Sequence, residues 1–303
     1  MVTDRIIQDS PKAWLLASRP KTLTAAAVPV LIGATLAHAD ASVAGAAFNW
    51  PAATLCMLFA FIMQIDANFI NDYFDFVNGT DDTERRLGPR RACAQGWVKP
   101  RSMKFAIAAT TLIACAIGFP LIFYGGIEMI LVGALCVLFC FLYTTFLSYI
   151  GLGDVLVFLF FGIVPVCVTY YIQTHTCPWT VWVAALGCGS VIDCLLLVNN
   201  YRDRDTDRES GKMTLVVRIG PEASRMLYLL CGITPCLLGI AFAIGGHWAA
   251  FLLPVAIYLP LHIRTFREIV RIDKGKALNK CLGQTARNIF IYGIAVSVGL
   301  AIL

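Results

Sequence analysis

At positions 191–207 the chain reads VIDCLLLVNNYRDRDTD, an apolar run that passes without a break into a polar cluster. Such a run is typical of a membrane helix, and the cluster stands where that helix would meet water. If the cluster is helical, Asn199, Asp203 and Asp207 recur every four residues and line one face. Oxygen ligands with cations nearby suit a magnesium-bound diphosphate. The stretch therefore predicts a membrane fold with a site at the membrane surface.

Composition agrees with a membrane protein. The chain has 303 residues, of which 58% are hydrophobic and 14% charged, and its mean hydropathy is +0.73. A soluble domain carries about 25% charged residues. Despite a net charge of +5, no nucleic-acid partner is expected, because the sequence has no basic-aromatic groove pattern and no zinc or helix-turn-helix spacing. The twelve cysteines form no C-x-x-C pair, which argues against a zinc knuckle or a redox dithiol.

Apolar segments of about 20 residues, the length that crosses a bilayer, recur along the chain. They predict an all-α membrane protein, a single polytopic domain over residues 1–303 with nine transmembrane helices in one bundle. The expected spans are 23–39, 51–70, 103–123, 127–147, 153–173, 179–198, 226–244, 248–264 and 286–303.

The distribution of Lys and Arg orients these spans. All 24 of these residues fall in the segments 5–21, 85–104, 202–225 and 264–287. With nine spans the four segments lie on one side of the membrane, and the opposite loops have none. Because cytoplasmic loops are enriched in Lys and Arg, we expect a cytoplasmic N-terminus and a cell (inner) membrane protein whose polar site faces the cytoplasm.

A second acidic stretch ends the second span. At helical spacing its polar residues form one stripe, made of Asn68, Asn71, Asp72 and Asp75. Gly79 then allows a turn, and Asp81 lies beyond it. The pair Asn71 and Asp75 precedes the pair Asn199 and Asp203 by 128 residues, and each pair ends a span. This repeated Asn-x-x-x-Asp pattern suggests that a helical unit is duplicated in the chain and that its two copies face each other.

Two facing acidic stripes could hold magnesium on a diphosphate and make it a better leaving group. Further negative charge could be taken up by nearby cations, namely Arg202, Lys212, Arg90 and Arg91. Two more acids, Asp66 and Asp193, lie within spans. Since an ionisable group inside a span is a functional hypothesis by default, we expect both to line the site; the alternative is a structural role, such as pairing with another span.

The two polar stretches resemble the two aspartate-rich motifs of the UbiA-type intramembrane prenyltransferases. The motifs read NDYFD at 71–75, followed by Gly79 and Asp81, and NNYRDRDTDRESGKMTL at 199–215. Within that superfamily, RPKTL at 19–23, LGPRR at 87–91 and GLGD at 151–154 are similar to members that act on 1,4-dihydroxy-2-naphthoate. The resemblance covers essentially the whole chain.

The resemblance implies a nine-helix bundle around a central cavity and the Mg²⁺-dependent transfer of a polyprenyl group. The donor would be an all-trans polyprenyl diphosphate, and the acceptor 1,4-dihydroxy-2-naphthoate, which would lose its carboxylate to give demethylmenaquinone, a step of menaquinone biosynthesis. Carried over by position, the metal and catalytic residues would be Asn71, Asp75, Asp81, Asp203 and Asp207. The substrate-binding residues would be Arg202, Lys212, Asn199, Tyr143, Asp154 and Arg90. Thr144 and Thr145 stand where the family often has glycines.

Three other functions remain open at this point. The first is the same chemistry on another aromatic acceptor, such as 4-hydroxybenzoate or homogentisate. The second is a CDP-alcohol phosphotransferase, whose D-G-x-x-A-R segment the sequence lacks. The third is a cation transporter, in which intramembrane acids mark the ion path; the clustering of the acids at one face argues against it.

Overall fold

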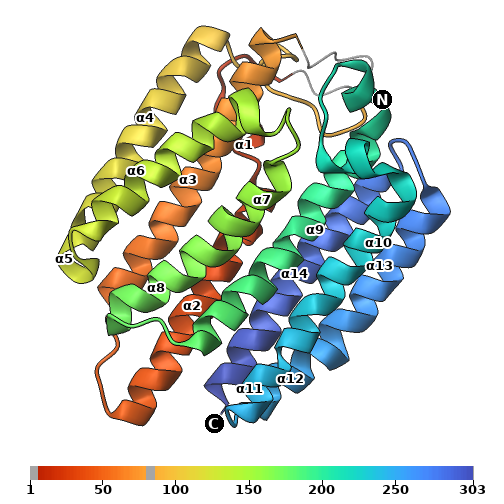
Figure 1. The fold of residues 1–303 in the computed structure, drawn as a ribbon. Coiled ribbons are helices and arrows are strands. Elements are labelled where there is room, and N and C mark those ends of the chain that lie inside the picture. Colours follow the sequence, from red (N-terminus) through yellow and green to blue (C-terminus); the bar gives the residue numbers. More distant parts are fainter. Residues whose placement is uncertain (1–5, 80–85, 303) are drawn as a thin grey trace.

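The computed structural model describes residues 6–79 and 86–302, and all of their regular structure is helical (Figure 1). The elements are, in order, α1 (Pro11–Ser18), η1 (Pro20–Thr22), α2 (Leu23–Ala44), α3 (Trp50–Val77), α4 (Pro100–Gly118), η2 (Phe119–Leu121), α5 (Ile122–Gly125), α6 (Glu128–Leu142), η3 (Tyr143–Leu147), α7 (Gly153–Phe158), η4 (Leu159–Ile163), α8 (Val164–Thr174), α9 (Trp179–Glu209), α10 (Leu215–Leu238), α11 (Ile240–Ile244), α12 (Trp248–Leu253), η5 (Pro254–Tyr258), α13 (Leu259–Ile272) and α14 (Leu278–Ala301).

Eight continuous helical segments of the described chain are long and apolar enough to cross a membrane. They are Pro11–Ala44, Trp50–Val77, Pro100–Gly125, Glu128–Leu147, Gly153–Thr174, Trp179–Glu209, Leu215–Ile244 and Trp248–Ile272. These confirm the first eight expected spans. The ninth, α14, has 24 residues and packs inside the same bundle, but its first half carries Lys280, Gln284 and Arg287 and is more polar. It begins at Leu278, earlier than the expected 286.

The two acidic motifs lie on helices, not on loops. The expected spans ended at positions 70 and 198, where the apolar residues end, but α3 continues to Val77 and α9 to Glu209. These extensions amount to about two and three helical turns. The motif side chains are therefore held on rigid extensions of α3 and α9, so their relative positions are fixed by helix packing.

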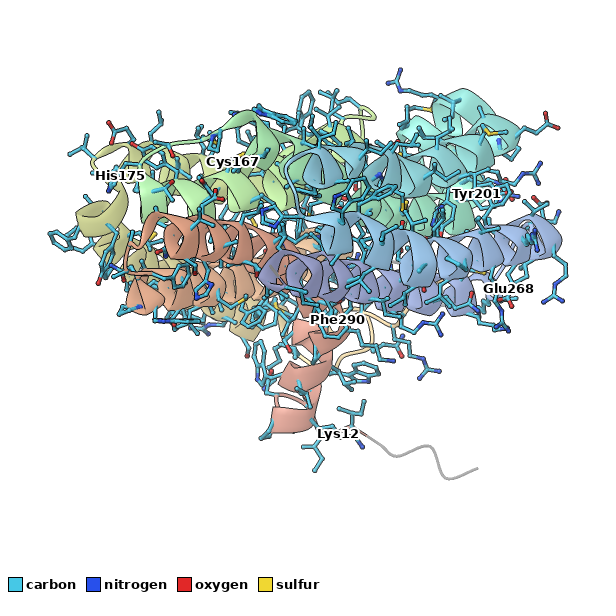
Figure 2. The ribbon with its side chains drawn as sticks, turned by 90° about the horizontal axis from the view of Figure 1, so that it is seen from below. Lys12, Cys167, His175, Tyr201, Glu268 and Phe290 are labelled. Atoms are coloured by element: carbon cyan, nitrogen blue, oxygen red, sulfur yellow. The ribbon has the colours of Figure 1, made fainter. Side chains whose placement is uncertain are left out.

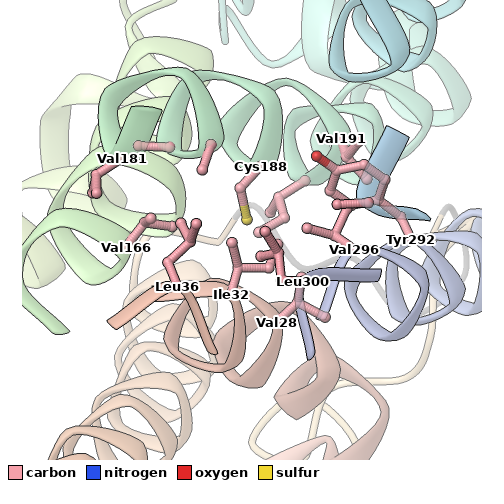
Figure 3. Close-up of a cluster of buried hydrophobic side chains, with 14 of the residues drawn as sticks. Val28, Ile32, Leu36, Val166, Val181, Cys188, Val191, Tyr292, Val296 and Leu300 are labelled. Carbon is pink, nitrogen blue, oxygen red and sulfur yellow. The ribbon is translucent and has the colours of Figure 1, made fainter. Parts of the chain in front are cut away.

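The main core joins α2, α8, α9 and α14. Figure 3 shows Ile32 of α2, Val166 of α8, Cys188 of α9 and Val296 of α14 packed around one centre, and each of these side chains is buried. Small residues let the helices approach closely. A Cβ on Gly162 of η4 would lie 2.5 Å from the backbone of Gly189 in α9. Close approach through small residues is the usual way in which membrane helices gain packing energy.

The two ends of the bundle differ in chemistry. Trp50, Trp179 and Trp248 begin α3, α9 and α12 and are 66%, 58% and 61% exposed. Aromatic residues of this kind are enriched at membrane–water interfaces. In Figure 2 His175, which follows α8, lies on the side opposite Tyr201 and Glu268. The acidic ends of α3 and α9 thus lie away from the tryptophan end.

The intramembrane acid Asp66 does not line the site, contrary to expectation. Its carboxylate is fully buried between α3 and α4 and accepts hydrogen bonds from Thr110 at 2.5 Å and Thr111 at 2.7 Å. Both oxygens are therefore satisfied by the neighbouring helix. Asp66 joins two helices inside the apolar layer, where a polar group without a partner would be costly.

The predicted stripe on α3 divides into two rows. Asn68 donates to the carbonyl of Ser18 and to Thr22 Oγ1, both at 2.9 Å, and so ties α3 to the corner between α1 and α2. Asp72 accepts the backbone N–H of Ala92 at 2.7 Å and of Cys93 at 2.8 Å. Asn68 and Asp72 thus fix the surroundings, whereas Asn71 and Asp75 turn towards the interior cavity described below.

Replacing Asp72 with Ala should lower the free energy of unfolding by about 3 kcal/mol, because two buried N–H groups lose a charged acceptor. Asp72→Asn keeps one accepting oxygen and should cost less. Thermal unfolding of the purified protein in detergent, compared with the exposed-site control Glu222→Ala, measures the effect. Equal midpoints for Asp72→Ala and Glu222→Ala would contradict this structural role.

Candidate active site

Arg202 organises the α9 half of the site. Its side chain is 1% exposed, and its Nε and Nη2 donate to the two carboxylate oxygens of Asp203 at 2.8 and 2.5 Å. Nη2 also donates to Asn199 at 2.8 Å, and Nη1 donates to Asn279 of α14 at 2.9 Å. Most of the N–H groups of Arg202 are thus committed to protein acceptors. The arginine holds Asn199 and Asp203 together on one face of α9.

The α3 half has a similar arrangement. Asp75 accepts a hydrogen bond from Arg91 Nη2 at 2.7 Å, and both side chains are largely buried. Asn71 accepts a hydrogen bond from Thr144 at 2.8 Å. Thr144 lies in η3, a single π-helical turn at the end of α6, and such turns are frequent at functional sites. Thr144 therefore orients a predicted metal ligand.

The described residues that precede α4, from Arg86 on, contact both halves of the site and reach the end of α9 in Figure 1. Asn279 donates to the carbonyl of Leu87 at 2.7 Å. The next residue, Gly88, packs so closely on the guanidinium of Arg202 that an added Cβ would lie 2.5 Å from Nη2. A side chain there would push the guanidinium of Arg202 away from its hydrogen-bond partners. The LGPRR stretch thus spans the distance between the acidic ends of α3 and α9.

Asp207 lies one turn beyond Asp203. Its Oδ1 is 3.9 Å from Nζ of Lys212, which also lies 5.9 Å from the ring of Tyr149. Its Oδ2 is buried and has no hydrogen-bond partner among the described residues. A buried carboxylate oxygen without a donor is costly unless a ligand completes it. Asp207 therefore keeps one carboxylate oxygen whose bonding capacity the described residues leave unused.

A cavity of about 1770 Å³ opens beside these residues. Of the predicted site residues, Asn71, Asp75, Asn199, Lys212 and Tyr143 line it. Its inner walls are apolar, with side chains such as Met63, Phe139 and Phe160. The cavity therefore combines a polar mouth with an apolar interior, as an amphiphile with an anionic head requires.

Other predicted residues lie behind or outside the wall. Arg202, Asp203, Asp207 and Asp154 are absent from the cavity lining of the described chain, and the exposed Arg90 is absent as well. Arg91 and Arg86 line the cavity instead of Arg90. Asp81 lies outside the described residues. The sequence could not choose among neighbouring loop arginines, because a loop has no period that would tell which side chain faces inward.

The mouth of the cavity has excess positive charge. Arg19, Lys21 and Arg287 line it together with Arg86 and Arg91. Burial, and then the charge of Arg91, lower the pKa of Arg86 to about 10, while Asp203 and Asp75 act in the opposite direction. A bound anion would relieve this repulsion. Preorganised cations of this kind stabilise negative charge that develops on a leaving group.

Asp154 and Asp193 face each other behind the cavity. The close contact of Gly162 and Phe158 with Gly189 fixes the crossing of α9 with α7 and η4. One turn further along each helix stand Asp154 and Asp193, which interact electrostatically. Both are buried, and each has an Oδ1 without a hydrogen-bond partner among the described residues. Neither carboxylate reaches the cavity, so the expectation that Asp193 lines the site is wrong.

The described residues hold no group of three or more His, Cys, Asp or Glu side chains close enough to cage a metal ion. Magnesium does not need such a cage, because it commonly binds one or two carboxylates together with substrate phosphates. The site offers oxygen ligands of the required type: the side chains of Asn71 and Asp75, and Oδ2 of Asp207, which has no hydrogen-bond partner among the described residues. The residues present therefore fit a magnesium ion shared with a diphosphate.

The role of Asn279 was not anticipated from the sequence. Asn279 contacts both Arg202 and Leu87 and lines the cavity. It sits at the start of α14, which brings it next to residues 77 and 192 positions earlier in the chain. Contacts between residues so far apart in the chain leave no recognisable pattern in the sequence around Asn279.

Comparisons with known proteins agree with this geometry. Residues 26–293 match the UbiA prenyltransferase family. The 1,4-dihydroxy-2-naphthoate octaprenyltransferase of Mycobacterium leprae is 32% identical over 293 residues, covering 95% of this chain and 96% of that protein. The chain belongs to the UbiA prenyltransferase family and is a multi-pass membrane protein.

Solved structures show the same fold. An apo UbiA homologue from Aeropyrum pernix K1 superposes with a TM-score of 0.66 at 17% identity, over 92% of this chain and 97% of that chain. A UbiA homologue from Archaeoglobus fulgidus bound to DMAPP and Mg²⁺ gives 0.56 at 14% identity, over 96% and 99%. The all-helical bundle predicted from the sequence is thereby confirmed.

Proposed function

We propose that this protein transfers a polyprenyl group from its diphosphate to 1,4-dihydroxy-2-naphthoate. The carbon–oxygen bond of the diphosphate breaks, a carbon–carbon bond to the ring forms, and the ring carboxylate leaves as carbon dioxide, giving diphosphate and the hydroquinone form of demethylmenaquinone. The observation that carries the proposal is the pair of acidic helix ends, joined by the Leu87–Gly88 loop, at the mouth of a largely apolar cavity. The name of the Mycobacterium leprae relative supports the acceptor.

Each part of the cavity has a role in this reaction. Magnesium, held by Asn71, Asp75, Asp81 and Asp207 with Asp203, would supply charge neutralisation on the leaving diphosphate. Arg91, Arg86 and Lys212 would contact its remaining oxygens. The apolar walls would hold the prenyl chain and keep water away from the electron-poor allylic carbon. Tyr143 lines the cavity and would face the ring.

Arg202 and Asp154 have indirect roles in this proposal. Arg202 positions Asp203 and Asn199 through the hydrogen bonds described above and has little capacity left for the diphosphate. Asp154 would act on the ring of the acceptor only through Tyr143, with which it interacts electrostatically. Arg90 is exposed and would at most attract the donor.

The single domain is proposed to lie in the cell membrane with this site facing the cytoplasm. The Lys and Arg segments and the acidic helix ends lie on one side, and the exposed tryptophans lie on the other. Because positive loops stay inside, the acidic end is the cytoplasmic one. In intact cells, the variant Asn78→Cys should gain label from a membrane-impermeant thiol reagent, relative to the parent protein, only after permeabilisation.

The acceptor is tested with purified protein in lipid nanodiscs and a labelled polyprenyl diphosphate. Product is expected with 1,4-dihydroxy-2-naphthoate, and little or none with 4-hydroxybenzoate or homogentisate. Chelation of divalent cations should abolish turnover, and Mg²⁺ should restore it better than Ca²⁺, which prefers more ligands at longer distances. Product from another acceptor but none from the naphthoate would overturn the assignment.

A further inference from the structure

A second groove, separate from the catalytic cavity, lies on the outer face of α13. It measures about 570 Å³. One end is apolar, formed by Leu259, Pro260 and Ile263, and the other end is cationic, formed by Arg264, Arg267 and Arg271. All three arginines are exposed. Their spacing of three and four residues places them on one face of the helix.

The one acid of the groove is directed elsewhere. Glu268 pairs with Lys280 at 3.2 Å and accepts a hydrogen bond from Gln284 at 2.9 Å, both on α14. Arg271 is attracted to this carboxylate only at longer range. Among the described residues, the three arginines have neither an ion pair nor a hydrogen bond to protein. The groove thus presents three guanidinium groups to an external anion.

The next acid along the chain is also engaged. Asp273 accepts a hydrogen bond from Tyr201 at 2.7 Å and pairs with Arg225 at 3.3 Å and Arg204 at 3.5 Å. The hydrogen bond from Tyr201, and then the arginine charges, lower the pKa of Asp273. The carboxylate of Asp273 is therefore paired with side chains of α9 and α10 and does not neutralise the groove arginines. The positive potential of the groove stays uncompensated by the protein.

The groove lies at the membrane surface beside the acidic end of the bundle. Figure 2 shows Glu268 on the same side as Tyr201. Ile257 and Val270, which lie on the same helical segment as the groove, are 47% and 42% exposed, as lipid-facing residues are. An occupant would therefore have its anionic part at the interface and an apolar part in the bilayer.

We propose that this groove binds an anionic phospholipid. The phosphate would contact Arg264, Arg267 and Arg271, whose guanidinium groups match phosphate geometry. The start of an acyl chain would lie along Leu259, Pro260 and Ile263. A volume of about 570 Å³ lies within the range of small-molecule sites. A soluble phosphate would leave the apolar half of the groove empty and would meet screened charges.

The test is a lipid-binding measurement on the full chain, by native mass spectrometry from a neutral detergent. Phosphatidylglycerol should bind and phosphatidylcholine should not. The variant R267Q/R271Q should bind phosphatidylglycerol roughly 30-fold more weakly, at about fivefold for each arginine near an anionic lipid. The matched control K274Q/K276Q removes the same charge just beyond α13 and should bind like the parent. Thermal unfolding confirms that each variant is folded.

Three results would overturn the proposal. Equal weakening by K274Q/K276Q would reduce the effect to general charge attraction. Equal affinity for glycerol phosphate would show that the apolar half contributes nothing. Displacement of phosphatidylglycerol from the groove by a lower concentration of polyprenyl diphosphate would assign the groove to the substrate. Binding, not turnover, is the readout, so the outcome does not depend on the proposed reaction.

Discussion

The variant Asp203→Asn is expected to transfer prenyl groups on the order of 10²–10³-fold more slowly than the parent protein. Asp203 binds two N–H groups of Arg202 with its two carboxylate oxygens. A carboxamide has one accepting oxygen and no charge, so it keeps part of this contact and is a weaker magnesium ligand than a carboxylate. Arg202 stays held by Asn199 and Asn279, so the helix end should remain in place. Initial rates measured against Mg²⁺ concentration should show a higher half-saturating value.

The matched control is Asp205→Asn, since Asp205 is an exposed carboxylate on the same helix turn. It should leave both the rate and the half-saturating Mg²⁺ concentration unchanged. If the Asp203→Asn protein had the activity of the parent, the α9 residues would not be part of the catalytic site, and the transporter hypothesis would be open again.

Helical period and charge distribution were enough to predict much of this protein. The recurrence of Asn71 and Asp75 at Asn199 and Asp203 predicted two matching helix ends, and both ends meet at one loop. Hydropathy predicted the spans because an apolar helix surface is a property of local sequence. The same signal missed the helical turns beyond Ile70 and Val198, since polar residues end the hydropathy signal but not the helix.

What could not be predicted depends on partners far away in the chain. Asp66 and Asp75 are both acids on α3, yet one meets threonines of α4 and the other meets Arg91. Nothing local to either aspartate tells them apart. Likewise, Arg202 was expected to hold diphosphate, but Asn279 and Asp203 occupy most of its donors. Tertiary contacts assign such roles, and a single sequence does not contain them.

The variant Asp75→Asn should also lower turnover by on the order of 10²–10³-fold, because Asp75 is the carboxylate of the α3 half that lines the cavity. It should in addition destabilise the protein, since the buried Arg91 loses its charged partner at 2.7 Å. Thermal unfolding and initial rates measured together separate these two effects. The control Asp9→Asn removes a more exposed partner of Lys99 and should change neither.

Combining Asp75→Asn with Arg91→Gln distinguishes the two roles of Asp75. Arg91→Gln alone should already lower turnover, because Arg91 would contact the diphosphate. If the carboxylate only neutralised Arg91, the double variant would match Arg91→Gln in both stability and turnover. We expect it to match in stability but to turn over more slowly, because replacing Arg91 removes the buried charge that Asp75 pairs with, while the charged oxygen donor for magnesium is still missing. The half-saturating Mg²⁺ concentration should rise in Asp75→Asn and in the double variant but not in Arg91→Gln. A double variant with the turnover of Arg91→Gln would reduce Asp75 to a structural partner of Arg91, and the site would then rest on α9 alone.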